Sequence, residues 1–312
     1  MKPKIRVLVC DPIENEGIEE LRQGGFEVDV NPTISKDQLR EVVSNYDALI
    51  VRSRTKVTRE IIEAGEELKA IGRAGVGLDN IDVETAEKRG IVLLNTPEAL
   101  ADAVAELTIG LILSLARSIP LADGTMKEGK WIKKELMGWQ LRGKTLGLIG
   151  LGNIGEKVAR IGKALGMNIL VTKRTPPTPE LQRELEAEYI PLKDFSNFLQ
   201  KSDVITIHIP LTPQTRHMIG GKEIQLMKDG AFIINTSRGE IVDEKALLEA
   251  LQSGKLGGAA IDVYEVEPPK DLALIRLSNV VCTPHIGGQT VESQKAAAIT
   301  IASKLVKLLR DA

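Results

Sequence analysis

Three residues in the second half of the chain combine a cation, an acid and a base: Arg238, Glu267 and His285. A guanidinium can hold a carboxylate through two parallel hydrogen bonds. An imidazole can accept a hydroxyl proton, and a carboxylate bonded to the imidazole fixes its tautomer and favours its charged form. This set of residue types suits the oxidation of an alcohol that stands next to a carboxylate.

Each of these residues also has an ordinary structural interpretation. An arginine in a loop is often solvated or bound to phosphate, and Glu267 beside two prolines could be the acid of a simple turn. His285 lies between Pro284 and glycines, in an exposed setting that favours a functional role. Each residue follows a predicted strand, where open α/β sheets present functional groups. The sequence alone does not show that the three side chains meet.

The segment KTLGLIGLGNIG (144–155) predicts a dinucleotide site. A buried strand over 145–149 runs into Gly150-x-Gly152-x-x-Gly155, and a helix is expected over 154–165. In this pattern the first glycine makes a tight turn, the second lets the backbone approach a pyrophosphate, and the third packs helix against strand. The N–H groups at the start of the helix then face the phosphates.

Short β-branched runs alternate with helical patterns along the whole chain, which implies parallel sheets with right-handed crossovers. The predicted strands are 5–9, 27–30, 48–51, 70–72, 91–94, 145–149, 168–172, 204–208, 231–235, 258–262 and 280–282. The predicted helices are 13–23, 35–43, 58–64, 83–88, 100–117, 154–165 and 291–309. We therefore expect an α/β fold of two doubly wound parallel-sheet domains, Rossmann or flavodoxin-like. A dinucleotide-binding domain (98–286) would be inserted into a substrate-binding domain (1–97 plus 287–312).

The composition excludes several classes of protein. The 312 residues are 43% hydrophobic and 27% charged, with a net charge of −2 and no basic stripe, which argues against nucleic-acid or membrane partners. Cys10 and Cys282 lie in apolar runs and indicate core thiols in a reducing compartment, so neither a disulfide framework nor a metal site is expected. The N-terminus lacks the pattern of a signal peptide, and we expect a cytoplasmic protein.

Five segments together resemble the D-isomer-specific 2-hydroxyacid dehydrogenases, over essentially the whole chain. They are GRAGVGLDNID (72–82), GLGNIG (150–155), INTSRGEIVDE (234–244), AIDVYEVEPP (260–269) and TPHIGGQT (283–290). The resemblance implies a dehydrogenase in which Arg238, Glu267 and His285 form the catalytic triad. It also implies a nicotinamide dinucleotide as cofactor, a small 2-hydroxy or 2-oxo acid as substrate and a homodimer.

The resemblance assigns dinucleotide contacts to the glycine loop and to residues after later strands. These are Gly150, Gly152, Asn153, Ile154, Gly155, Lys173, Arg174, His208, Pro210, Thr236, Ser237, Asp262 and Gly287. NAD-specific relatives place an aspartate at the end of the second strand, where it binds the ribose 2′-OH. Lys173 and Arg174 stand there instead and would attract a 2′-phosphate, so NADP(H) is expected. The alternative is a solvated basic pair, with NAD bound by other contacts.

Within the family, LIVRSRTKVT (49–58) and KELMGWQLRGKTLG (134–147) are similar to segments of the 3-phosphoglycerate dehydrogenases. This implies 3-phosphoglycerate and its oxo acid, in serine biosynthesis, as substrates, and a short form without a regulatory domain. Arg52 and Arg54 would bind the substrate's anionic groups, and Val76 and Gly77 would offer backbone N–H groups to its carboxylate. The alternative for the arginines is a solvated loop.

Two other functions stay open. The segment PEALAD (97–102) looks more like the glyoxylate and hydroxypyruvate reductases, which often use NADPH. The second alternative is a non-catalytic, dinucleotide-sensing binding protein, because the family also resembles some transcriptional corepressors.

Overall fold

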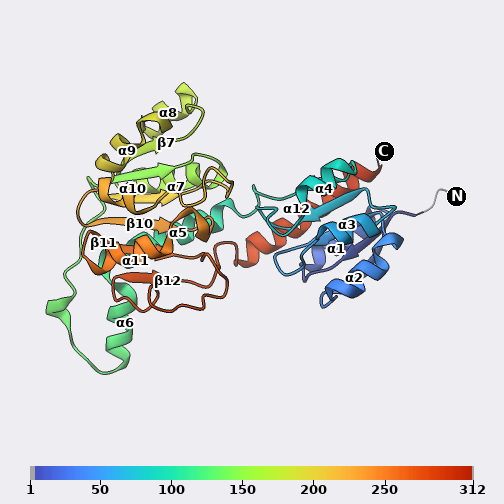
Figure 1. The fold of residues 1–312 in the computed structure, drawn as a ribbon, viewed down its shortest axis with the longest axis horizontal. Helices are drawn as coiled ribbons and strands as arrows, with labels where there is room; N and C mark the ends of the chain where they lie inside the picture. The colour runs from blue at the N-terminus through green and yellow to red at the C-terminus, as the bar shows by residue number, and fades with distance from the viewer. Residues whose placement is uncertain (1–3, 311–312) are drawn as a thin grey trace. The chain divides into compact units, whose positions relative to one another are not determined.

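A computed structural model describes residues 4–310, which form two compact α/β units. The residues up to 101 and those from 288 onward form the first unit, and residues 102–287 form the second (Figure 1). The strands of both sheets pair in parallel. The predicted fold class of two parallel-sheet domains is confirmed.

The first unit is a five-stranded sheet in the order β2-β1-β3-β4-β5. Its strands are β1 (Arg6–Val9), β2 (Glu27–Val30), β3 (Ala48–Val51), β4 (Ala70–Arg73) and β5 (Val92–Leu94). Its helices are α1 (Asn15–Gln23), α2 (Lys36–Val42), α3 (Arg59–Ala64), α4 (Val83–Lys88) and α12 (Val291–Arg310). One core lies between the sheet and the pair α1 and α12, and a second lies under α2, α3 and α4.

The second unit is a seven-stranded sheet in the order β12-β11-β10-β9-β6-β7-β8. Its strands are β6 (Thr145–Ile149), β7 (Asn168–Thr172), β8 (Glu188–Tyr189), β9 (Val204–Ile207), β10 (Ala231–Asn235), β11 (Leu256–Ile261) and β12 (Val280–Cys282). Its helices are α5 (Ala101–Arg117), α6 (Ile119–Lys127), α7 (Asn153–Ala164), α8 (Pro179–Leu185), α9 (Phe195–Lys201), α10 (Gly221–Leu226) and α11 (Glu244–Gln252). Residues of α5 and α7 pack on one face of this sheet, and those of α9, α10 and α11 pack on the other. The chain reverses its winding direction at β6, which lies between β7 and β9.

The predicted strands all occur, with ends within one or two residues of those expected. The two helix starts that the sequence indicates most clearly are also present. Ser35 accepts a bond from the Gln38 amide in a full capping box, and Asp82 accepts one from the Thr85 amide. The sequence pattern did not predict the short elements α6, α8, β8, α9, α10 and α11.

Among residues 4–310, no single helix is long and apolar enough to cross a membrane. Helices α5 and α6 meet that test of length and composition only as a pair bent by 66°.

Candidate active site

The residues predicted to bind the dinucleotide or to act in catalysis follow the carboxyl ends of the strands of the second unit. Gly150 follows β6, Lys173 follows β7, His208 follows β9, Thr236 follows β10, Asp262 follows β11 and Thr283 follows β12. Because the strands are parallel, these ends lie along one edge of the sheet. The switch in winding at β6 puts the glycine loop where open α/β folds bind ligands.

The glycine loop has the geometry that a pyrophosphate requires. Gly150 has φ +95°, and a Cβ there would lie 2.4 Å from the His208 carbonyl oxygen. A Cβ at Gly155 would lie 2.4 Å from the Gly150 oxygen, so this glycine lets α7 pack against the loop. Gly152 is the N-cap of α7 and supplies no capping side chain, and a Cβ there would meet no atom within 4 Å. The space beside Gly152 and the N–H groups at the start of α7, beginning with Asn153 and Ile154, therefore fit a phosphate group.

Lys173 lies beside this loop. It comes directly after β7, and its ammonium group donates to the Leu151 carbonyl at 3.4 Å. Its own carbonyl accepts a bond from the Tyr189 hydroxyl at 3.1 Å, which fixes the backbone at this point. Arg174 is exposed. The end of β7 thus carries positive charge next to the glycine loop.

The predicted contacts after β9 and β10 are held by local bonds. Burial lowers the pKa of His208 to about 3, so its ring is neutral, and its Nε2 lies 2.8 Å from the Thr206 hydroxyl. Pro210 accepts a bond from the Thr215 hydroxyl through its carbonyl oxygen. The Thr236 hydroxyl lies 3.0 Å from that of Thr108. The Ser237 hydroxyl donates to Asn235 Oδ1 at 2.9 Å.

Glu267 and His285 meet directly. His285 Nδ1 lies 2.8 Å from one Glu267 oxygen and 3.0 Å from the other. Burial would raise the pKa of Glu267, but His285, the Tyr264 amide and the charge of Arg238 together lower it, so the carboxylate is ionised. His285 has φ +53°, a left-handed conformation that is uncommon outside glycine. Because Glu267 occupies Nδ1, the histidine can exchange a proton with a ligand through Nε2.

Asp262 holds the loop that carries His285. Its side chain is buried, and its Oδ1 accepts bonds from the Thr283 hydroxyl at 2.6 Å and the Ile286 amide at 2.8 Å. Its Oδ2 accepts the Gly287 amide at 2.8 Å, and its backbone oxygen accepts the His285 amide at 2.8 Å. Asp262 and Gly287 were expected to bind the dinucleotide. In the structure, the bonds between them help to fix the turn around His285.

Arg238 follows β10 in extended backbone, and its carbonyl oxygen accepts a bond from Asn235 Nδ2 at 2.8 Å. The next residue, Gly239, presses against the loop that leads to Glu267: a Cβ there would lie 1.9 Å from the Tyr264 carbonyl carbon. This backbone contact brings the arginine close enough for its charge to act on Glu267. The structure thus joins a cation, a carboxylate and an imidazole at one end of the sheet.

The predicted substrate residues belong to the first unit. The Arg54 guanidinium bonds to the Cys10 and Ile34 carbonyl oxygens and pairs with buried Asp11 at 3.0 Å. Asp11 also accepts the Arg52 amide, while the Arg52 guanidinium makes a longer bond of 3.3 Å to the Pro12 oxygen.

Val76 and Gly77 lie in the segment after β4 and are half-buried. The Val76 carbonyl oxygen accepts a bond from Asn95 Nδ2 at 2.6 Å.

Three supporting residues were not predicted from the sequence: Asp11, Asn235 and Gly239. The sequence shows Gly239 only as the glycine after Arg238. A side chain is excluded at this position by the loop at Tyr264, more than twenty residues later in the chain. Asn235 and Asp11 each follow or end a buried strand, which was the one available signal.

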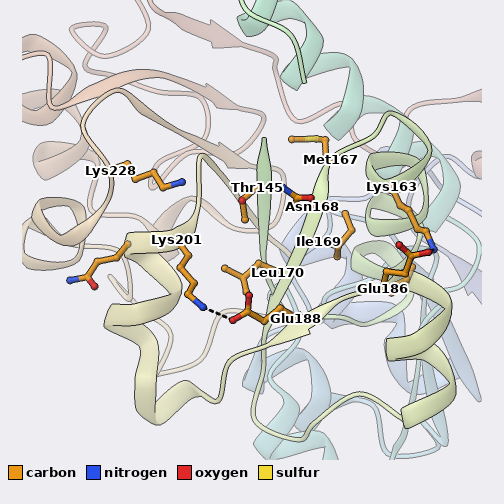
Figure 2. A pocket seen from close by; sticks show the side chains of 12 residues that line it. Thr145, Lys163, Met167, Asn168, Ile169, Leu170, Glu186, Glu188, Lys201 and Lys228 are labelled. Carbon is orange, nitrogen blue, oxygen red and sulfur yellow. Dashed lines mark hydrogen bonds and ion pairs between the residues drawn. The ribbon is translucent and has the colours of Figure 1, made fainter. Parts of the chain in front are cut away.

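A cavity of about 560 Å³ lies at the opposite edge of the second sheet (Figure 2). It is lined by Thr145 and Asn168, which begin β6 and β7, and by lysines already in ion pairs, such as Lys201 with Glu188 at 2.5 Å. This cavity is separate from the catalytic set, which lies at the carboxyl ends of the strands.

The sequence of this chain is similar to those of several dehydrogenases and reductases. Over 98% of its length it is 48% identical to a D-3-phosphoglycerate dehydrogenase of Methanocaldococcus jannaschii, of which it covers 58%. It is also 48% identical to a hydroxypyruvate reductase of Thermotoga maritima, covering 98% of this chain and 99% of that one. The chain thus spans little more than half the length of the phosphoglycerate dehydrogenase it matches.

The fold of this chain is also similar to that of a solved reductase structure. An NADPH-dependent glyoxylate/hydroxypyruvate reductase from Sinorhizobium meliloti, in complex with NADP and malonate, superimposes with a TM-score of 0.85 at 30% identity, over 98% of this chain and 94% of that one. Residues 109–287 match the family described as "D-isomer specific 2-hydroxyacid dehydrogenase, NAD binding domain". The second unit is therefore a nicotinamide-dinucleotide-binding domain, and the chain belongs to the D-isomer-specific 2-hydroxyacid dehydrogenase family.

Proposed function

We propose that this protein is an NAD(P)(H)-dependent dehydrogenase that interconverts D-2-hydroxy acids and 2-oxo acids. The observation that carries the proposal is the contact between His285 Nδ1 and Glu267 at 2.8 Å, with Arg238 acting on the same carboxylate. These groups lie at the same sheet edge as the glycine loop. In this proposal, proton exchange and carboxylate binding take place beside the proposed dinucleotide site.

The three residues have different parts in this reaction. Arg238 binds the carboxylate of the substrate and neutralises charge next to the reacting carbon. In the oxidation, His285 Nε2 takes the hydroxyl proton, and in the reduction it returns a proton to the carbonyl oxygen. Glu267 holds the ring by Nδ1 and stabilises the imidazolium that forms. The dinucleotide, when bound, supplies or accepts the hydride at the substrate's second carbon.

We propose NADP(H) as the preferred form. Lys173 supports this choice, because its ammonium group lies beside the phosphate-binding turn, at the position where an aspartate would bind the ribose of NAD. Exposed Arg174 adds a second cation. For the rest of the dinucleotide, we propose contacts with the pyrophosphate at Gly152 and further contacts at Pro210, Thr236 and Ser237.

As substrate we propose 3-phosphoglycerate with 3-phosphohydroxypyruvate, which would place the enzyme in serine biosynthesis. Arg52 is the better of the two candidates for the phosphate. Burial lowers the pKa of Arg52, although Asp11 and Glu14 act to raise it, so the guanidinium is partly desolvated and would gain from an anion. Arg54 already pairs with Asp11, which indicates a supporting role in the same loop.

A specific observation favours a second candidate, a hydroxypyruvate or glyoxylate reductase. The chain is 48% identical to the Thermotoga maritima hydroxypyruvate reductase, the same identity that it has to the phosphoglycerate dehydrogenase. The lysine after β7 also fits a reductase that uses NADPH.

A steady-state panel separates the candidates. NADH and NADPH are each tested with phosphohydroxypyruvate, hydroxypyruvate and glyoxylate, for the wild type and Arg52→Ala. We expect Arg52→Ala to raise KM for the phosphorylated substrate alone, and Arg59→Ala to serve as control because Arg59 is exposed and pairs with Glu63. Equal effects of Arg52→Ala on all three substrates would favour the reductase, and no turnover at all would favour a dinucleotide-sensing binding protein.

We also propose a homodimer built on α6 and the segment that follows it. Helix α6 has no buried residue, and apolar side chains stand exposed here, including Met126 at 56%, Trp131 at 77% and Met137 at 90%. Exposed apolar surface of this extent is typical of an interface. Light scattering after gel filtration should give twice the chain mass of 34.0 kDa, and Trp131→Glu should shift it toward the monomer.

The two thiols, Cys10 and Cys282, are both free. They fit the proposed cytoplasmic location, where thiols stay reduced.

A further inference from the structure

Near Glu267, two glutamates form a reciprocal pair of hydrogen bonds, in which the backbone amide of each donates to the carboxylate of the other. The Glu265 amide donates to Glu244 Oε1 at 2.8 Å, and the Glu244 amide donates to Glu265 Oε1 at 3.1 Å. Glu244 is the first residue of α11, so this reciprocal pair ties the loop after β11 to the start of a helix. Glu265 stands two residues before Glu267, and the pair therefore fixes the loop close to the catalytic carboxylate.

A histidine completes this group. His217 Nε2 lies 3.1 Å from Glu265 Oε1, the same oxygen that accepts the Glu244 amide. Its backbone has φ +51°, so the ring is aimed by a conformation that few non-glycine residues adopt. The His217 amide donates to the Glu240 carbonyl oxygen at 2.8 Å. His217 thus touches both the loop of Glu265 and the turn that follows Arg238.

The two loops that these residues join are those that carry Arg238 and Glu267. Gly239, next to Arg238, already presses its backbone against Tyr264 and Glu265. Arg216 adds an ion pair of 2.8 Å to Glu240 on the same turn. On the far side, the Glu267 carboxylate accepts the Tyr264 amide at 3.2 Å. The separation of Arg238 and Glu267 is therefore set by backbone contacts that Glu265 anchors.

We propose that His217, Glu244 and Glu265 are positioning residues that set the orientation of Glu267, and through it the tautomer of His285. This inference rests on the proposed function. None of the three needs to touch the substrate, because each acts through the Tyr264–Glu267 segment. Burial, with the charges of Glu265 and Asp271, raises the pKa of Glu244, against the bond it accepts from the Glu265 amide.

Glu265→Ala tests the proposal, with Glu265→Gln as the conservative variant that keeps an acceptor for the Glu244 amide. The matched control is Glu188→Ala, which removes the ion pair with Lys201 at the other edge of the sheet (Figure 2). We expect Glu265→Ala to lower kcat roughly 10- to 100-fold, the effect of a small misplacement of a catalytic group, with little change in KM for the dinucleotide. Glu265→Gln should recover most of kcat, and Glu188→Ala should match the wild type.

A second readout does not depend on turnover. The chain has three histidines, so nitrogen-15 NMR of labelled histidine resolves each ring, and His285→Gln assigns the signal. At a pH where the ring is neutral, wild-type His285 should carry its proton on Nδ1, facing Glu267, and Glu265→Ala should mix the two tautomers. His217→Asn, in which the shorter side chain suits the left-handed backbone, should show the same effect more weakly.

Unchanged kcat and an unchanged His285 tautomer in Glu265→Ala would overturn the proposal, even if the variant were less stable. If Glu265→Ala does not fold, wild-type behaviour of His217→Asn in both measurements would overturn it. A wild type that turns over no 2-oxo acid would sink the proposed function instead, and the tautomer measurement would still decide this inference.

Discussion

Replacing Gly152 by alanine should weaken dinucleotide binding and leave the fold intact. Gly152 has φ −100° and ψ −160°, which alanine adopts without strain, and its Cβ would meet no protein atom within 4 Å. Alanine lowers the conformational entropy of the unfolded chain, which stabilises the folded state by about 0.4–1 kcal/mol. Alanine is also a poorer N-cap residue than glycine, which costs a similar amount. The free energy of unfolding should therefore change by less than about 0.5 kcal/mol.

The new methyl group would occupy the space that a pyrophosphate needs beside α7. Losing one charge-assisted hydrogen bond from a backbone N–H costs about 1.5–3 kcal/mol, which raises Kd for the dinucleotide roughly 10- to 150-fold. Calorimetric titration with NADPH and NADH measures Kd, and urea unfolding of the unliganded protein measures stability. Gly221→Ala is the control, since Gly221 begins α10 and its Cβ would lie 3.9 Å from the Ala246 Cβ.

Gly150→Ala, unlike Gly152→Ala, should destabilise the fold, because φ at Gly150 is +95° and the new Cβ would lie 2.4 Å from the His208 carbonyl oxygen. It should lower the free energy of unfolding by about 1–3 kcal/mol. A Gly152→Ala protein that binds both dinucleotides like the wild type would refute the assignment of this loop.

Three further predictions concern single side chains. Lys173→Asp should raise KM for NADPH at least about 10-fold and lower KM for NADH, as measured in steady-state assays. Arg238→Ala should lower kcat and raise KM for the oxo acid together, because the cation both binds the carboxylate and supports the reacting centre; a change in KM alone would count against that role. Burial would raise the pKa of Asp203, but the Thr145 amide and Lys228 bring it below its ordinary value of 3.8. Its stabilising effect is therefore present above pH 3.8 and lost progressively as the pH falls below 3.8 through the lowered pKa of the folded state. Asp203→Asn should cost about 1 kcal/mol in urea unfolding at neutral pH and less at pH values below 3.8.

The strands could be predicted because buried parallel strands are short apolar runs between polar turns. β3 (ALIV) and β6 (TLGLI) are nearly all buried and have the predicted bounds. The short helices of the second unit carry weaker signals. α10 has six residues and begins after Gly220 with Gly221, which favours a turn in the sequence, and tertiary packing of Ile224 decides its state.

In the candidate site, the positions of the residues could be predicted, but the contacts between their side chains could not. That Arg238, Glu267 and His285 follow strand ends could be predicted, because residues after parallel strands share one edge of the sheet. The contact between Glu267 and His285 could not, since it depends on the loop that Asp262 holds through both carboxylate oxygens. Sequence spacing carries no record of that support, and Asp262 was expected only to bind the dinucleotide.

Proton transfer by His285 is the central claim, and kinetic analysis of His285→Ala tests it most directly. The variant should turn over no 2-oxo acid, while its Kd for the dinucleotide, measured by calorimetry on the same preparation, stays close to that of the wild type. A variant that keeps most of the wild-type kcat/KM would contradict the claim.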